Sequence, residues 1–275
     1  TFIVDLAPAA FAIDLFTTED AGAVTNTINI VGGILTIDET ATMLGSASVT
    51  AYTMNIAANA GIIQTGAQVE GTNSTMNVVL QGGNITYNGA GTAVAFNLDS
   101  DAGADGTLTV ITAGIKAFAG TVGATNGLTT AVVGAVGDDA QATFAETVKV
   151  ATITILSGEA SGENSSATFA KAVTGNIVMT DGADAASHAL LNFTGQTAAT
   201  ALSGTITTTK TDADDTLVTI TDAGGGAAAA QTFTGQIGTA THKIASLAVG
   251  AAGGNAGIAI FDEDVFVNAL VISSD

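Results

Sequence analysis

The sequence contains no cysteine, no tryptophan and a single proline in 275 residues, and aromatic residues make up only 5% of it. Without cysteine the chain forms no disulfide, no thiolate metal centre and no thiol nucleophile. The scarcity of proline suits long ladders of backbone hydrogen bonds, which proline would interrupt. Glycine is frequent, with 34 residues, but it is not periodic, and this excludes a collagen-type triple helix.

Positive charge is also scarce. The chain has 5 basic residues, all of them lysine, against 25 acidic residues, and its formal net charge is -20. Nucleic acids and anionic membrane surfaces are bound through clusters of lysine and arginine, which this acidic chain does not offer. The sequence therefore predicts no nucleic-acid partner. It also predicts no transmembrane segment, because no run of about 18 apolar residues occurs.

The apolar residues occur in short bursts of valine, isoleucine, leucine, phenylalanine and threonine. Examples are residues 27–31, 108–112 and 150–155. Clusters of glycine, asparagine, aspartate and serine separate the bursts every 8 to 12 residues or so, which is typical of an all-β protein. The best helix candidates are residues 7–16 and 183–190, each with one or two turns at most.

An internal repeat runs through the chain. In the N-terminal half, an asparagine stands between apolar residues at Asn29, Asn55, Asn77 and Asn97, and a turn and a second apolar burst follow each one. This series predicts either a stacked ladder of side-chain amides or a repeated turn entry.

In the C-terminal half, five similar pentapeptides begin with phenylalanine, at Phe118, Phe144, Phe169, Phe193 and Phe233. The last interval is irregular, and residues 217–220 look like a degenerate copy within it. Together the two series indicate a unit near 25 residues.

A unit of this length cannot bury an apolar face alone, but stacked units bury a continuous core. We therefore predict a parallel β-solenoid (β-helix) of roughly 25-residue coils; the competing architecture is one or two antiparallel β-sandwich domains. The expected organisation is an apolar N-terminal segment at 1–20, the solenoid at 21–257 and a C-terminal β segment at 258–275.

The pattern of residues 233–238 followed by 243–249 resembles the repeats of large bacterial surface proteins, namely autotransporter passengers, adhesins and surface-layer proteins. Residues 118–123 form a second, looser copy, and the resemblance covers about residues 114–260. It implies secretion to the extracellular space or the bacterial cell surface, a β-solenoid, and a role in adhesion or surface coating. No receptor-binding motif comes with it.

One acidic turn has the composition of a calcium loop. Asp99, Asp101 and Asp105 alternate with small residues before the turn at Gly106. Calcium takes several oxygen ligands, which alternate carboxylates can supply. The alternative is a solvated acidic turn, so the expectation for cofactors is none, or calcium at these three residues.

Both ends of the chain are strongly apolar, whereas an isolated solenoid should hide its open ends behind polar caps or charges. The segments fold back as caps, or they pair with a neighbouring subunit by stacking or strand donation. We favour assembly with further copies of the same chain. The residues expected at this interface are Phe2, Ile3, Val4, Leu6, Phe11, Ile13, Val265, Phe266, Val267, Leu270, Val271 and Ile272, with the apolar run 258–261 beside them.

Catalysis is not expected. His188 and His242 lie in no motif that marks a nucleophile, and a polysaccharide-cleaving site would need sugar platforms that Tyr52 and Tyr87 alone do not provide. The sequence thus predicts a secreted, non-catalytic structural protein, the subunit of an extracellular filament or surface layer. The alternative is an adhesin stalk or binding module that contacts cell-surface glycans.

Overall fold

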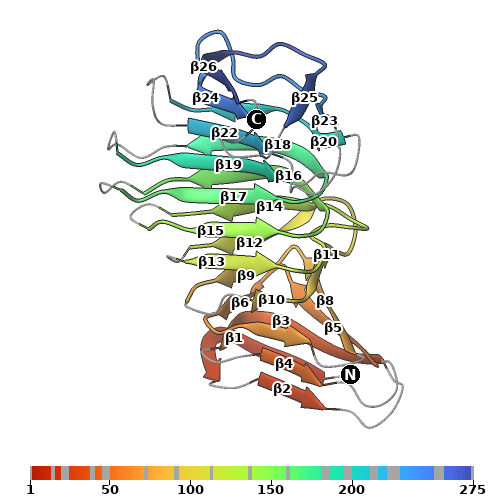
Figure 1. Cartoon of the computed structure of the whole chain (residues 1–275). Coiled ribbons are helices and arrows are strands. Elements are labelled where there is room, and N and C mark those ends of the chain that lie inside the picture. Colours follow the sequence, from red (N-terminus) through yellow and green to blue (C-terminus); the bar gives the residue numbers. More distant parts are fainter. Residues whose placement is uncertain are drawn as a thin grey trace.

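The described residues fold into strands and turns without a helix, as a computed structural model of the chain shows (Figure 1). The prediction of a parallel β-solenoid is confirmed, and the β-sandwich alternative is wrong, because every pair of neighbouring strands is parallel and the partners belong to successive coils. The structure describes residues 2–13, 16–19, 25–37, 41–44, 50–70, 74–89, 93–111, 114–135, 138–158, 162–180, 186–194, 200–210, 216–221, 230–250 and 257–273.

One wall of the solenoid is an 11-stranded sheet to which each coil gives one strand. Its strands, in spatial and sequence order, are β2 (Phe16–Glu19), β4 (Ala41–Leu44), β7 (Gln68–Glu70), β10 (Ala93–Val94), β13 (Ile115–Phe118), β15 (Gln141–Phe144), β17 (Ser165–Phe169), β19 (Ala189–Thr194), β22 (Thr216–Thr221), β24 (Ile244–Val249) and β26 (Val267–Ile272).

The remaining walls belong to a 15-stranded sheet. Its strands are β1 (Phe2–Ile13), β3 (Thr25–Ile37), β5 (Thr50–Ala57), β6 (Ala60–Gln64), β8 (Ser74–Gln81), β9 (Asn84–Tyr87), β11 (Asn97–Ser100), β12 (Asp105–Val110), β14 (Leu128–Val133), β16 (Val148–Leu156), β18 (Val173–Thr180), β20 (Thr200–Ser203), β21 (Ile206–Thr208), β23 (Ala230–Phe233) and β25 (Ile258–Phe261).

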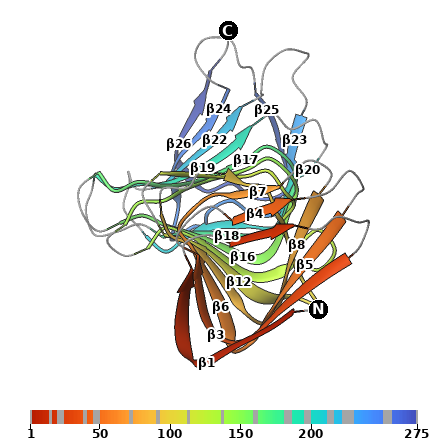
Figure 2. The ribbon, with the colours of Figure 1, turned by 90° about the horizontal axis from the view of Figure 1, so that it is seen from below.

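The larger sheet bends into two arms, and β3 shows how. Residues 25–30 of β3 pair with β5, whereas residues 33–37 pair with β6. The bend falls at Gly33, whose φ of 74° is a left-handed conformation that glycine adopts without a steric penalty. Each coil therefore crosses the first arm, the second arm and the smaller sheet in turn, and the view from below shows the arms diverging (Figure 2).

The core follows from strict alternation along the strands. In β12, Leu108 and Val110 are buried while Thr107 and Thr109 lie on the outer face. Adjacent residues of a strand point to opposite faces, and in-register pairing repeats the same choice in the next coil. The result is one continuous apolar interior between outer faces rich in threonine and asparagine.

Four of the five repeated phenylalanines form one stack in the core. Phe118, Phe144, Phe169 and Phe193 pair in register at intervals of 24 to 26 residues, and their ring centroids lie 4.8, 5.1 and 5.8 Å apart. These distances are close to the ~4.8 Å separation of neighbouring strands, so the coil spacing itself brings the rings into contact.

The fifth phenylalanine lies in the other sheet, so the prediction that it continues the same series is wrong. Phe193 pairs with Ile220, which confirms that residues 217–220 are the degenerate copy. Phe233 instead pairs with Leu202 in the larger sheet, and its ring meets Phe193 edge-on across the core at 5.0 Å. Both sheets accommodate a phenylalanine that faces the core just before a corner of the coil. The pentapeptides of the two sheets therefore look alike.

Both helix expectations are wrong in the described residues. Residues 7–13 belong to β1, Phe16 begins β2, and Ala189 and Leu190 begin β19; residues 186–188 form no helix, and the other expected helical positions lie outside the described residues. Alanine favours helices, but a helix of one or two turns is marginal, and pairing with the neighbouring coil outweighs that preference. The part of the chain that the structure describes contains no helix able to span a membrane.

Candidate functional site

The asparagine series forms two pairs rather than one ladder. The Nδ2 of Asn55 donates to Oδ1 of Asn29 at 2.7 Å, and the Nδ2 of Asn97 donates to Oδ1 of Asn77 at 3.2 Å. Between the pairs the register is offset, because Asn77 lies opposite Thr53 and not opposite Asn55. The ladder prediction is therefore wrong at this step, since the interval between Asn55 and Asn77 is two residues shorter than one coil.

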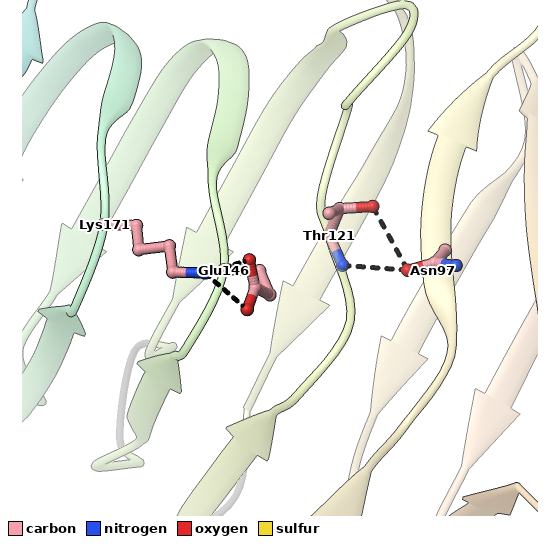
Figure 3. Close-up of polar contacts among 4 residues, drawn as sticks. All are labelled: Asn97, Thr121, Glu146 and Lys171. Carbon is pink, nitrogen blue, oxygen red and sulfur yellow. Dashed lines mark hydrogen bonds and ion pairs between the residues drawn. The ribbon is translucent and has the colours of Figure 1, made fainter. Parts of the chain in front are cut away.

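Asn97 also binds the coil that follows. Its Oδ1 accepts hydrogen bonds from the backbone N–H of Thr121 at 3.0 Å and from the Thr121 hydroxyl at 3.2 Å (Figure 3). The same arrangement recurs where Asn176 accepts from the N–H and the hydroxyl of Thr205, both at 3.1 Å. Asparagine thus joins coils where regular strand pairing is interrupted, which is a structural role.

An ion pair joins two turns of the outer surface. The ammonium of Lys171 lies 2.6 Å from the carboxylate of Glu146 in the preceding coil (Figure 3). Because both side chains are at least one-third exposed, water and salt screen their attraction, and the pair contributes little to stability.

Asp99 is occupied by backbone contacts. Its Oδ1 accepts from the N–H groups of Asn126 at 2.8 Å and Ser100 at 3.0 Å, and its Oδ2 accepts from the N–H of Thr125 at 3.1 Å. The carboxylate therefore shapes the turn of the next coil, a role that the calcium-loop interpretation did not foresee.

The other two aspartates of this turn contact each other. Burial and a hydrogen bond with Asp101 raise the pKa of Asp105, while a backbone hydrogen bond at Gly82 opposes that effect. Among the described residues, no group of three or more aspartate, glutamate or histidine side chains is placed to hold a metal ion. Calcium at Asp99, Asp101 and Asp105 therefore stays a prediction.

Because the pKa of Asp105 is raised, we expect the stability of the folded chain to depend on pH. The folded chain holds the Asp105 proton more tightly than the unfolded chain, so this contribution to stability is complete below pH 3.8 and is lost as pH rises through the raised pKa. We expect Asp105→Asn to increase the thermal midpoint at pH 7 and to change it little at pH 3.5, as followed by circular dichroism.

The matched control is Asp138→Asn, which removes the same charge from an exposed aspartate. It should leave the difference between the two pH values unchanged. A lower midpoint for Asp105→Asn at pH 7, seen only with calcium present, would contradict this interpretation and would indicate that the carboxylate binds the ion.

A buried lysine is the polar residue that sequence reasoning missed. The side chain of Lys116 is 2% exposed and lies in the same column as Ala142 of the next coil. Its ammonium donates to the carbonyl of Gly89, and burial lowers its pKa. The only available signal was the alternation in residues 115–118, which places position 116 on the same face as Phe118.

The two histidines lie in different settings. His188 is half-buried, its backbone N–H donates to Asn164, and its Nδ1 is buried without a partner. The acidic residues Asp181 and Asp184 before it lie outside the described residues. His242 lies in a surface turn with its Nδ1 3.0 Å from the hydroxyl of Thr241.

The N-terminal interface residues all lie in β1. β1 pairs with β3 and with no other described strand, so it forms one edge of the larger sheet (Figure 1). Its registered positions include Phe2 opposite Ile28, Phe11 opposite Leu35 and Ile13 opposite Ile37. This segment forms the first coil of the described solenoid instead of folding back across its end.

The C-terminal interface residues form the last described coil. Leu270 and Ile272 are 56% and 73% exposed, although their partners Leu247 and Val249 in the preceding coil are buried. Val265, Phe266 and Val267 are half-buried, and Val265 and Val267 pack against the core. Val265 and Val267 therefore help to close the core, whereas Leu270 and Ile272 remain exposed.

Two further residues belong to this end and were absent from the expected interface set. Ile258 and Ile260 of β25 are 47% and 46% exposed on the outer face, in the columns of Ala230 and Thr232. Their place in the apolar run 258–261 was a visible signal, but their orientation follows only from the pairing of β25 with β23.

The described residues form a parallel β-solenoid whose last described coil leaves Leu270, Val271 and Ile272 exposed. No protein-family model, curated protein or solved structure matches the chain.

Proposed function

We propose that the chain is a secreted, non-catalytic structural protein, the subunit of a bacterial extracellular filament or surface layer. The observation that carries this proposal is the last described coil, in which Leu270, Val271 and Ile272 are 56%, 47% and 73% exposed. Large apolar side chains beside free strand edges favour association with another β-structure.

The distribution of polar groups supports the proposal. The outer faces of the sheets carry columns of uncharged residues, such as Thr107, Thr130 and Thr152. A rod whose sheets carry such uncharged columns on their outer faces is suited to a mechanical or coating role. The resemblance of residues 114–260 to surface-protein repeats points to the same setting at the cell surface.

The net charge of -20 opposes assembly at low ionic strength. Salt at physiological concentration screens exposed charges beyond about 8 Å, which would allow acidic subunits to approach one another. We therefore expect assembly to strengthen with added salt.

The test is negative-stain electron microscopy with sedimentation analysis of the purified chain, at low and moderate salt, with and without calcium. Filaments or lattices that grow with salt are the expected result. Isolated short rods under every condition, at all concentrations up to about 1 mM, would overturn the proposal, since self-association weaker than this corresponds to only about 4 kcal/mol.

The second candidate is an adhesin stalk or binding module for cell-surface glycans. The observation that favours it is a shallow depression of about 460 Å³ on the first arm, lined by residues that include Asn77, Asn97, Asp99 and Thr121. Amide and hydroxyl groups can bind sugar hydroxyls, but no aromatic side chain lines the depression. A glycan-array screen with an Asn77→Ala control tests this candidate.

A further inference from the structure

We propose that two copies of the chain stack head to tail, with the β1–β2 edge of one copy continuing the β25–β26 edge of the other in the same parallel sense. This inference rests on the proposed function and specifies its contact. The partner it assigns to the uncovered end is a second copy of this chain.

Three columns of paired residues run through the described coils from one end of the solenoid to the other. In the first arm the column begins at Phe2 and ends at Phe261; in the second arm it begins at Phe11 and ends at Val265. In the smaller sheet it begins at Phe16 and ends at Ile272. Each column therefore has an apolar residue at both ends.

The interior of each column is apolar along almost its whole length. The column of the smaller sheet consists of Phe16, Ala41, Gln68, Val94, Phe118, Phe144, Phe169, Phe193, Ile220, Val249 and Ile272. A second copy placed next to the last described coil would bring Phe16 beside Ile272. The column would then continue with another pair of apolar residues from adjacent coils.

The last described coil has a neighbouring coil on one side only among the described residues. Leu270 and Ile272 occupy the same columns as Leu247 and Val249, which are 0% and 8% exposed. They differ only in having no coil above them among the described residues. If the β2 edge of another copy covered Leu270 and Ile272, these side chains would be buried like their counterparts in the preceding coil.

The parallel strands select the polarity of the contact. All strands of both sheets are parallel, so a second copy in the same orientation continues the hydrogen-bond pattern without reversing it. A two-fold contact between two C-terminal ends would instead set β26 antiparallel to its own copy and would leave the β1–β2 edge uncovered. A head-to-tail contact is heterologous and does not close, so it builds a filament.

Cysteine cross-linking tests the polarity, because the native chain contains no cysteine. The register that places Phe16 next to Ile272 also places Thr17 next to Ser273. Neighbouring strands are about 4.8 Å apart, which lies within the Cα separation of about 4.4 to 6.8 Å that a disulfide spans. The variants are Thr17→Cys, Ser273→Cys and the double variant, each oxidised under the conditions of the electron microscopy and compared by non-reducing electrophoresis.

We expect a ladder of cross-linked multimers from the double variant, heterodimers from a mixture of the single variants, and no homodimer of Ser273→Cys. A disulfide-linked homodimer of Ser273→Cys would establish a two-fold contact and overturn the head-to-tail polarity. Filaments without cross-linking between positions 17 and 273 would overturn the contact but leave the proposed function standing. A parent chain that does not polymerise, together with a double variant that does not cross-link, would overturn both.

A second variant tests the contact without cysteine. Leu270→Asp places a charge in the proposed interface, and Ile115→Asp places the same charge on an isoleucine that is 49% exposed on the flank. Loss of one large apolar contact should raise the critical concentration for polymerisation by about 10- to 100-fold for Leu270→Asp. Equal effects of the two variants would overturn the end contact, and circular dichroism verifies that both are folded.

Discussion

Replacement of Phe169 by alanine is expected to lower the free energy of unfolding by about 3 to 5 kcal/mol, the usual cost of deleting a buried aromatic ring. Phe169 is 0% exposed, and its ring lies between Phe144 and Phe193 at centroid distances of 5.1 and 5.8 Å. The hydrogen-bonded coils hold the neighbouring rings apart, so the sheets cannot collapse into the cavity. Urea unfolding followed by circular dichroism measures the loss.

Two controls separate the cavity from general damage. Phe169→Leu keeps most of the volume and should cost clearly less than Phe169→Ala. Leu190→Ala removes a large side chain from the outer face of β19, the strand next to Phe169, and should cost no more than about 1 kcal/mol. A similar loss for Phe169→Ala and Leu190→Ala would contradict the buried aromatic stack.

The architecture was predictable because the repeated residues are large and apolar and therefore must face inward. Phe118, Phe144 and Phe169 recur at one coil length, and a parallel solenoid is the arrangement that brings such residues into a single column. The absence of cysteine excluded a disulfide-bonded scaffold and the near-absence of proline suited continuous strand ladders, but only the repeat favoured a solenoid over a β-sandwich.

The wall to which each residue belongs was harder to predict. Phe233 opens the same kind of pentapeptide as Phe193, yet it lies in the other sheet, because the irregular interval before it holds one strand of each wall. Asn55 and Asn77 fail to meet for a related reason, since their interval is shorter than a coil. The register of the strands depends on the lengths of the turns, and these lengths cannot be read from the amino-acid composition.

The apolar end segments were visible in the sequence, but their role as an interface stays a prediction. Leu270 and Ile272 are exposed in the last described coil. The sequence did not show that Val265 and Val267 pack against the core, nor that Ile258 and Ile260 face outward. That division depends on which strand of the preceding coil each residue meets.

The acidic turn shows a further limit of composition. Asp99, Asp101 and Asp105 look equivalent in the sequence, but Asp99 caps backbone N–H groups of the next coil while the other two contact each other. The partners of Asp99 are Thr125 and Asn126, about one coil away along the chain. Local spacing carries no information about contacts across that distance.

At the corner glycines, successive coils approach each other more closely than any side chain allows. At Gly175, where φ is 134°, an added Cβ would lie 1.6 Å from the carbonyl oxygen of Val150 in the preceding coil. The contact recurs up the stack, since a Cβ on Gly204 would lie 2.1 Å from the carbonyl oxygen of Gly175. Gly175→Ala must therefore push successive coils apart.

We expect Gly175→Ala to cost more than about 4 kcal/mol, a loss confined to severe steric or cavity defects, and to leave little soluble folded protein. Gly162→Ala is the matched control, because Gly162 also has a positive φ, 87°, but an added Cβ meets nothing within 4 Å. Backbone strain alone should then cost about 1 to 2 kcal/mol. Soluble yield and thermal midpoint distinguish the variants, and equal losses would show that backbone strain, and not the approach of the coils, requires glycine at Gly175.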